Sequence, residues 1–258
     1  MCLILFSWQQ SAAHPLILAA NRDERYDRPT RGLHNWQQPH GIIGGRDLQA
    51  GGSWLAANQQ GRFAAVTNVR DPRLVSDDAR SRGSLITDYL TSDLSSDEWL
   101  GELRERRDDY AGFNLLVGDL RLSQLTCYSN LTDQLDKLSP GTYGLSNGSL
   151  DEPWPKVERG KRLLTESLST TSEPDITDLF TLLADDYQPH ETLLPNTGVG
   201  TDLERLLAPI TIHSELYGTC SSSVFLAHAN GKLQLHEQDR RPETIATLLS
   251  ESWMAIAD

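Results

Sequence analysis

The order of strand-like and helix-like segments is the feature that most constrains the fold of this chain. Apolar runs that suit strands occur in blocks, and segments of helical periodicity separate these blocks instead of following each strand in turn. A parallel sheet requires a long crossover connection, usually a helix, between neighbouring strands. The sequence therefore predicts an α+β fold built from layers of helix and mostly antiparallel sheet.

Alternating apolar residues and short turns mark the strands, whereas apolar residues three and four positions apart mark the helices. Ser95 and Glu98 form a capping-box pattern, which indicates the start of a helix. Pro155 suits a first helical turn, where its missing N–H needs no partner. The expected strands cover residues 2–6, 16–20, 53–57, 63–67, 113–117, 125–129, 142–145, 222–228 and 232–237. The expected helices cover residues 85–90, 95–103, 155–168 and 176–183.

Length and composition limit the class of protein. No Pro-, Gly- or Ser-rich linker divides the 258 residues, so residues 1–258 are expected to form one domain. The net charge of -13 would repel phosphate backbones, which argues against nucleic acid as a partner. No apolar run reaches the roughly 18 residues of a membrane-spanning helix, and Met1–Trp8 lacks the basic flank of a secretory signal. We therefore expect a cytoplasmic protein without a transmembrane segment; the oligomeric state stays open.

Motifs for metal or serine chemistry are weak. The three cysteines are too far apart for a disulfide framework, and none of the seven histidines lies in a haem-attachment signature. No paired-histidine or acidic-loop signature predicts a metal site. Gly144–Gly148 matches the Gly-x-Ser-x-Gly nucleophile elbow, but Pro153 and Pro155 follow too soon for the helix that this elbow requires.

Cys2 occupies a chemically special position. Methionine is normally removed when the second residue is small, and removal would leave a thiol and a free α-amine on Cys2. An α-amine has a reference pKa of about 7.7 to 8.0, so it can accept the thiol proton near neutral pH. One residue would then supply both nucleophile and base. The alternative is that Cys2 only begins a buried strand, as cysteine often does.

Four charged residues follow the second expected strand, in Asn21-Arg22-Asp23-Glu24-Arg25. If the first two strands pair as a hairpin, this charged end lies beside Cys2. Arg22 would then favour the thiolate, and Asp23 would orient the ammonium group. A solvated turn would explain the charges but not their position opposite the start of the chain.

Asparagines recur where expected strands end. Turn chemistry explains such a pattern, because asparagine tolerates left-handed backbone and bonds to its own chain. A second interpretation is that several strand ends meet at one rim, where amide groups would stabilise a developing oxyanion. The residues concerned are Asn21, Asn58, Asn68, Asn114, Asn130 and Asn147.

An ordered series of short motifs resembles the NRDE-motif proteins, the family of the transport and Golgi organisation protein. The likeness extends from residue 1 to about residue 240. The motifs are Met1-Cys2-Leu3, Asn21-Arg22-Asp23-Glu24, Gly51-Gly52-Ser53-Trp54-Leu55, Thr67-Asn68-Val69-Arg70, Gly112-Phe113-Asn114-Leu115-Leu116, Leu145-Ser146-Asn147 and Tyr217-Gly218-Thr219. Such proteins resemble in turn the N-terminal nucleophile hydrolases, in particular cysteine amidases related to penicillin V acylase.

The resemblance implies a four-layer αββα sandwich with Cys2 at the mouth of the central sheets. It also implies roles for individual residues, with no cofactor required. The implied catalytic residues are Cys2 as nucleophile, Arg22 and Asp23 as groups that set its protonation, and Asn68 and Asn114 as oxyanion donors. The implied substrate-binding residues are Asn21, Trp54, Asn147 and Cys220. Many relatives have arginine where this chain has Cys220.

Two classes of function follow from the resemblance. The first is hydrolysis of a non-peptide amide or thioester through Cys2. The second is non-catalytic binding of haem or of a lipid-like acyl compound in the same cleft, because relatives are associated with such ligands. Haem would then be cargo, and the Arg22-Asp23 pair would be structural or would hold a carboxylate. A third class, a scaffold or trafficking adaptor, would show an exposed apolar patch.

Overall fold

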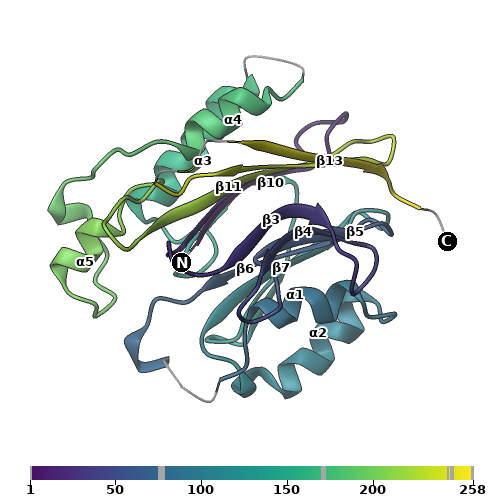
Figure 1. Ribbon diagram of the computed structural model, residues 1–258, viewed down its shortest axis with the longest axis horizontal. Helices are drawn as coiled ribbons and strands as arrows, with labels where there is room; N and C mark the ends of the chain where they lie inside the picture. The colour runs from purple at the N-terminus through teal and green to yellow at the C-terminus, as the bar shows by residue number, and fades with distance from the viewer. Residues whose placement is uncertain (1, 75–78, 170–172, 243, 245–246, 257–258) are drawn as a thin grey trace.

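Two stacked antiparallel sheets form the centre of the molecule, and helices cover their outer faces (Figure 1). The computed structural model describes residues 2–74, 79–169, 173–242, 244 and 247–256. The first sheet has the strand order β10 (Gly141–Leu145), β1 (Cys2–Trp8), β2 (Leu16–Arg25), β11 (Tyr217–Ala227), β12 (Lys232–Asp239) and β13 (Leu248–Met254). The second has the order β3 (Thr30–Asn35), β4 (Ile42–Asp47), β5 (Leu55–Asn58), β6 (Arg62–Asn68), β7 (Phe113–Asp119), β8 (Gln124–Ser129) and β9 (Gln134–Lys137).

The helices divide between the two outer faces. α1 (Gly83–Leu90) and α2 (Ser96–Glu105) pack on the second sheet, whereas α3 (Pro155–Ser169) and α4 (Ile176–Leu183) pack on the first. The short α5 (Thr201–Leu206) lies beyond the sheets, at the end of the molecule where the chain begins (Figure 1). The short 3-10 turns are η1 (Pro72–Leu74), η2 (Arg107–Asp109) and η3 (Glu191–Leu193). This arrangement is the predicted αββα sandwich.

Three apolar layers hold the sandwich together, one between the sheets and one under each pair of helices. The strand β1 contributes to two of them. Ile4 and Phe6 point between the sheets, and Leu3 and Leu5 point toward α3 and α4. A strand buried on both faces reads as a continuous apolar run instead of an alternating one. The continuous apolar run at the start of the chain therefore predicts a strand there, in agreement with β1.

The sequence prediction missed β3, β4, β9, β13 and α5 and misplaced the end of β2. The missed β3, β9 and β13 lie at sheet edges, where side chains are half-buried or exposed and apolar periodicity is weak. β2 continues to Arg25 because β11 pairs with it along its whole length. The charged residues 22–25, which were expected to follow the strand, therefore lie within it.

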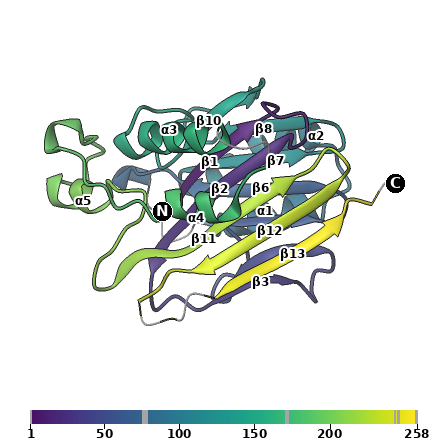
Figure 2. The same cartoon turned by 90° about the horizontal axis from the view of Figure 1, so that it is seen from above.

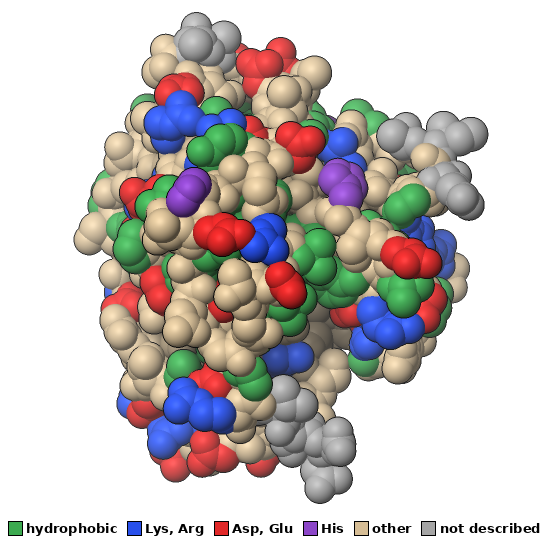
Figure 3. All heavy atoms as spheres, turned by 90° about the vertical axis from the view of Figure 1, so that its left-hand side faces the viewer, with side chains coloured by type: hydrophobic (Ala, Val, Ile, Leu, Met, Phe, Trp, Pro, Cys, Tyr) green, Lys and Arg blue, Asp and Glu red, His purple; other side chains and the backbone are tan. Residues whose placement is uncertain are grey.

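Charges on the face that carries α5 do not gather into one patch. Acidic, basic and apolar side chains are interspersed there (Figure 3). Among the described residues, the helices are too short or too polar to cross a bilayer.

A carboxyl group joins the two sheets at their open side, where β3 lies next to β13 (Figure 2). A register shift in the β3–β4 pairing lies at Gly32 and Leu33. The Leu33 N–H donates instead to Glu237 Oε1 on β12, at 2.9 Å. A Cβ on Gly32 would lie 3.1 Å from the same oxygen, so glycine allows the close approach. Burial raises the pKa of Glu237 to about 7.

We expect this glutamate to make folding pH-dependent. Its ordinary pKa is 4.5, so the folded protein holds a proton that the unfolded chain releases as the pH rises from 4.5 to 7. The free energy of unfolding should therefore fall by about 3 kcal/mol across that window. Glu237→Gln keeps an acceptor for Leu33 but does not titrate, so its curve should be flatter. Urea unfolding at a series of pH values measures the difference.

The matched control is Glu251→Gln on the neighbouring β13, where the side chain is half-exposed. Its pH profile should follow the wild type. Parallel profiles for all three proteins would contradict the assignment of a raised pKa to Glu237.

Candidate functional site

The pairing of β1 with β2 brings the start of the chain to Arg22. Their antiparallel register sets Cys2 directly opposite Arg22 and Leu3 opposite Asn21. Residues opposite each other in a sheet project from the same face. Cys2 and Arg22 both project between the two sheets, as Ile4 and Ala20 do further along. The hairpin expected from the sequence is therefore present.

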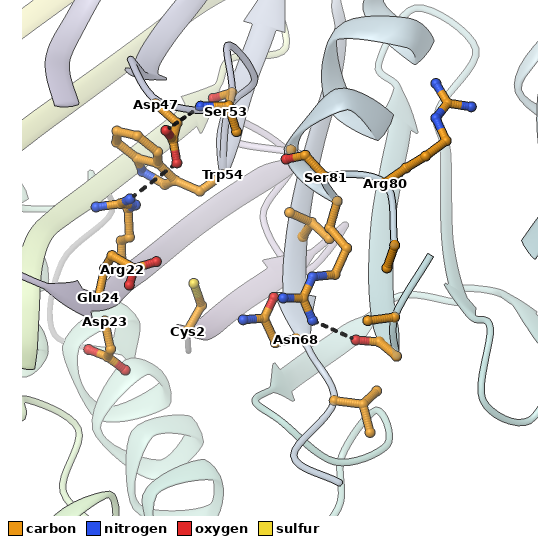
Figure 4. A pocket seen from close by; sticks show the side chains of 18 of the residues that line it. Cys2, Arg22, Asp23, Glu24, Asp47, Ser53, Trp54, Asn68, Arg80 and Ser81 are labelled. Atoms are coloured by element: carbon orange, nitrogen blue, oxygen red, sulfur yellow. Dashed lines mark hydrogen bonds and ion pairs between the residues drawn. The ribbon is translucent and has the colours of Figure 1, made fainter. Parts of the chain in front are cut away.

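Cys2 lies at a cavity of about 380 Å³ at this end of the sandwich (Figure 4). Residues from both sheets and from the loop before α1 line it. The walls include Cys2, Arg22, Asp23, Trp54, Asn68 and Arg82. The wall of this cavity thus combines charged side chains with a thiol, an indole and an amide.

The Arg22 side chain is almost completely buried, with 6% of its surface exposed. Its guanidinium carbon lies 4.5 Å from the centre of the Trp54 ring, in a cation–π arrangement. Its nearest carboxylate, Asp47, is 3.8 Å away and also pairs with Arg28 at 2.6 Å. Gly45 makes room for the indole, because a Cβ there would lie 2.2 Å from the Trp54 ring. Arg22 is therefore fixed by stacking more than by charge pairing.

Asp23 projects toward the helices instead of into the core between the sheets. Thr219 donates its hydroxyl to Asp23 Oδ1 at 2.7 Å, and the Tyr217 hydroxyl donates to the Asp23 carbonyl at 3.1 Å. Burial raises the pKa of Asp23, while the charge of Lys156 opposes that shift. Lys156 donates to the Leu207 carbonyl at 3.0 Å, and burial lowers its pKa to about 8. The charge of Lys156 thus partly offsets the effect of burial on Asp23, which lines the cavity.

Two effects compete at the Cys2 thiol. Burial raises its pKa above the ordinary value of 9, and the charge of Asp23 acts in the same direction. The charge of Arg22 and a hydrogen bond from the Asp23 backbone lower it. Burial is the larger effect, so the thiol is mostly protonated at neutral pH. A group that accepts its proton is needed before the sulfur becomes a nucleophile.

The expected asparagines divide between the cavity and the protein interior. Asn68 lines the cavity beside Cys2 (Figure 4). Asn147 donates to the Asn68 carbonyl at 2.8 Å and therefore holds that strand end in place. Asn114 donates to Thr67 and to the Gly148 carbonyl, so both amide protons have protein acceptors. This bonding does not support Asn114 as an oxyanion donor.

The remaining expected residues lie away from the Cys2 cavity. Asn21 faces α4 and donates to the carbonyls of Leu183 and Ile210, while Ser222 donates to its side-chain oxygen. These bonds account for its amide group and give it a structural role. Cys220 is buried at a bulge in β11, and its thiol lies 3.4 Å from the Glu24 carbonyl. Burial raises the pKa of Cys220 to about 11. Of the four expected substrate contacts, only Trp54 lines this cavity.

Arg82 and Lys156 were not predicted from the sequence. Arg82 is half-buried on the cavity wall, where it donates to the Gly112 carbonyl at 3.1 Å. Among the described residues no carboxylate lies within ion-pairing distance of Arg82. Neither residue belongs to a motif, and each lies at the start of a helix where a basic residue has no local explanation. A basic residue at the start of a helix is thus the only feature of the sequence that could have drawn attention to Arg82 or Lys156.

Comparison with known sequences identifies the family. Residues 1–242 match the family described as transport and Golgi organisation 2. The chain belongs to this family. The transport and Golgi organisation 2 homolog of Mus musculus is 34% identical over 256 residues, with 92% of each chain covered. The Homo sapiens homolog gives the same identity and coverage, and the Drosophila melanogaster protein is 28% identical over 269 residues.

Solved structures show how this family member folds. A mutant conjugated bile acid hydrolase from Clostridium perfringens superposes with a TM-score of 0.51 at 10% identity, covering 100% of this chain and 97% of that one. A Caenorhabditis elegans N-acylethanolamine-hydrolyzing acid amidase ortholog gives 0.52 at 11% identity, covering 87% and 92%. The chain thus has an N-terminal nucleophile hydrolase-like fold.

A buried ion pair supports the Asn68 side of the cavity, and its removal should destabilise the protein. Glu204 Oε2 accepts from Arg70 at 2.6 Å, and Oε1 accepts from the Thr197 backbone and hydroxyl. The Arg70 N–H donates to the Asn147 carbonyl, so the pair holds the strand end that carries Asn68. Glu204→Ala leaves the buried guanidinium without this carboxylate, and we expect a loss of about 3 kcal/mol in chemical unfolding.

The same substitution at an exposed pair is the control. Glu166 accepts from Arg162 at 2.8 Å, but both side chains are more than half exposed. Glu166→Ala should leave the unfolding midpoint nearly unchanged, because solvent screens exposed pairs. Equal midpoints for the two variants would show that the buried pair contributes nothing.

Proposed function

We propose that this protein is an N-terminal cysteine hydrolase that cleaves a non-peptide amide or thioester. The observation that carries the proposal is the pairing of Cys2 with Arg22 at one cavity, with Asp23 in its lining. The names of the structurally similar proteins, a bile acid hydrolase and an acid amidase, agree with amide hydrolysis. The three free thiols fit a reducing, cytoplasmic location.

The reaction begins once Met1 has been removed and the α-amine of Cys2 is free. The amine accepts the thiol proton, and the sulfur attacks the substrate carbonyl carbon while the carbonyl electron pair moves to oxygen. Collapse of the tetrahedral intermediate breaks the C–N or C–S bond. The leaving amine or thiol takes the proton from the ammonium group. Water then attacks the acyl-enzyme thioester and passes a proton to the amine, which releases a carboxylic acid and restores the thiol.

Other residues around the cavity set the protonation state of Cys2 and stabilise the charges that develop on the substrate. The charge of Arg22 favours the thiolate, and Asp23 holds the ammonium form of the α-amine. Asn68 would donate to the oxyanion from the opposite sheet, and its position in the cavity lining supports this role. Arg82 offers a further donor for a negatively charged part of the substrate.

Non-catalytic binding in the same cavity is the competing function. Arg22 and Arg82 would then hold a carboxylate of haem or of an acyl compound. Among the described residues no group of three histidine, cysteine or acidic side chains is arranged around a common point, so haem iron would be held without such a set. A hydrolase and a binding protein differ in whether Cys2 forms a covalent acyl intermediate.

We expect wild-type protein to lose Met1 and to gain an acyl group on Cys2. Intact mass spectrometry shows the first. Brief incubation with the octanoyl thioester of N-acetylcysteamine, followed by acid quenching and peptide mapping, shows the second. Cys2→Ala should show neither acylation nor thioester turnover, whereas Cys127→Ala, at a buried thiol outside the cavity lining, should retain both. A chain that keeps Met1 and is never acylated would exclude the hydrolase, and saturable haemin binding sensitive to Arg22→Ala would then support the binding function.

Alkylation should reveal the effect of Arg22 on the thiol. Because the Arg22 charge lowers the pKa of Cys2, Arg22→Leu should shift the pH profile of iodoacetamide labelling at Cys2 to higher pH. Peptide mapping separates Cys2 from Cys127, whose pKa burial raises to about 12. The remote, exposed Arg162→Leu is the control and should keep the wild-type profile. Coincident profiles for both variants would remove Arg22 from the mechanism.

A further inference from the structure

A second cavity, of about 260 Å³, borders the first. We name the two after Cys2 and Ser221. They share Arg22 and Trp54, so the stacked pair forms a common wall. The Ser221 cavity opens between β12 and β13 of the first sheet and β3 of the second, the side where those strands lie together (Figure 2). Its polar walls include Ser221, Glu237 and Asp239.

The strand register aligns residues of the two cavities in one row across the first sheet. Cys2 is opposite Arg22, Arg22 is opposite Ser221, and Ser221 is opposite Asp239, across β1, β2, β11 and β12. All four side chains project between the sheets, because opposite residues share a face. Neighbouring strands lie about 4.8 Å apart, so Ser221 is roughly 10 Å from Cys2 along this row. A single extended ligand could contact both ends.

Two buried donors in the shared region have no partner within the part of the chain that the structure describes. They are Ser221 Oγ and Trp54 Nε1. Ser221 is only 8% exposed. Its neighbour Ser222, on the opposite face, donates to Asn21 at 2.7 Å and accepts from Arg240 at 3.1 Å. Buried polar groups are nearly always hydrogen-bonded, so the two donors at this cavity point to a ligand that accepts from them.

The charge at the shared wall favours an anion. The Arg22 guanidinium has its nearest carboxylate, Asp47, at 3.8 Å, and Arg28 holds that carboxylate more closely. On the other side of the cavity, Asp239 is neutralised by the Arg241 guanidinium at 3.0 and 3.1 Å. Protein carboxylates therefore compensate the positive charge of Arg22 only weakly, and this charge is available to attract an anionic ligand. A carboxylate is a small anionic group whose two oxygens can accept from a guanidinium, a hydroxyl and an indole N–H together.

We propose that the Ser221 cavity binds a free carboxylate at the far end of the acyl ligand, held by Ser221 Oγ, Trp54 Nε1 and Arg22. The inference rests on the proposed function, since it places the reacting carbonyl at Cys2. It names the substrate class as half-amides or half-thioesters of dicarboxylic acids whose two carbonyl carbons lie roughly 10 Å apart. A simple monocarboxylic acyl chain lacks the group that these donors require.

Binding to Cys2→Ala protein tests the subsite separately from catalysis. The probes are the monoamide of suberic acid, octanamide and ω-hydroxyoctanamide, which share one chain length, measured by calorimetry at a pH below the pKa of Glu237 so that its carboxyl is neutral. Only the suberic monoamide carries a carboxylate, so it should bind roughly tenfold more tightly than the other two, as expected for a charge-assisted hydrogen bond. The monoamide of succinic acid, which is too short to reach both ends, should bind more weakly than the suberic monoamide. Equal affinities for the suberic monoamide and octanamide would overturn the proposal, whether or not wild-type protein hydrolyses thioesters.

Variants identify the residues responsible. Ser221→Ala and Trp54→Phe should each reduce the preference for the suberic monoamide over octanamide roughly tenfold. Phenylalanine keeps a ring over Arg22 but removes the N–H. Ser221→Ala should not lower the melting temperature, because the hydroxyl it removes has no described protein partner. Ser222→Ala should lower the melting temperature and leave the preference unchanged. A preference that survives Ser221→Ala, or falls equally in Ser222→Ala, would contradict the assignment.

Discussion

The antiparallel pairing of β1, β2 and β11 is the constraint on which the site depends. It fixes which residues stand opposite Cys2 and which face they share. The register is strongly determined, because sliding β1 by one position would move Ile4 and Phe6 out of the layer between the sheets. The apolar residues of the strands thus hold the polar row in place. Chemistry at the chain start is a consequence of packing further along the same strands.

Burial determines the properties of the charged groups around the site and makes their assembly energetically costly. Four charged side chains are nearly inaccessible to water, namely those of Arg22, Asp23, Lys156 and Glu237. Asp23 and Glu237 have raised pKa values, and Lys156 has a lowered one, all chiefly because of burial. Perturbed groups of this kind gather at functional sites, although structural networks produce them too. Arg22 differs from a residue of a purely structural network because it lines two cavities.

The sequence was informative where local patterns decide the structure and silent where distant strands meet. β1 and the capping box of α2 follow from apolar runs and spacing. The position of Arg22 beside Cys2 follows from assuming one hairpin. Glu237 could not be placed, because its partner Leu33 is 204 residues away and belongs to the other sheet. The resemblance implied an oxyanion role for Asn114, and the sequence could not show that its amide donates to Thr67 and to the Gly148 carbonyl.

The bulge at Cys220 shows how one strand serves two faces of the sheet. In a regular strand Thr219 and Ser221 would point to the same side, since side chains alternate. The extra residue shifts the register, so that Thr219 lies opposite Asp23 and Ser221 lies opposite Arg22. Asp23 and Arg22 are adjacent and face opposite sides, so each needs its own partner from β11. Without the bulge, β11 could supply the hydroxyl that orients Asp23 or the one beside Arg22, but not both.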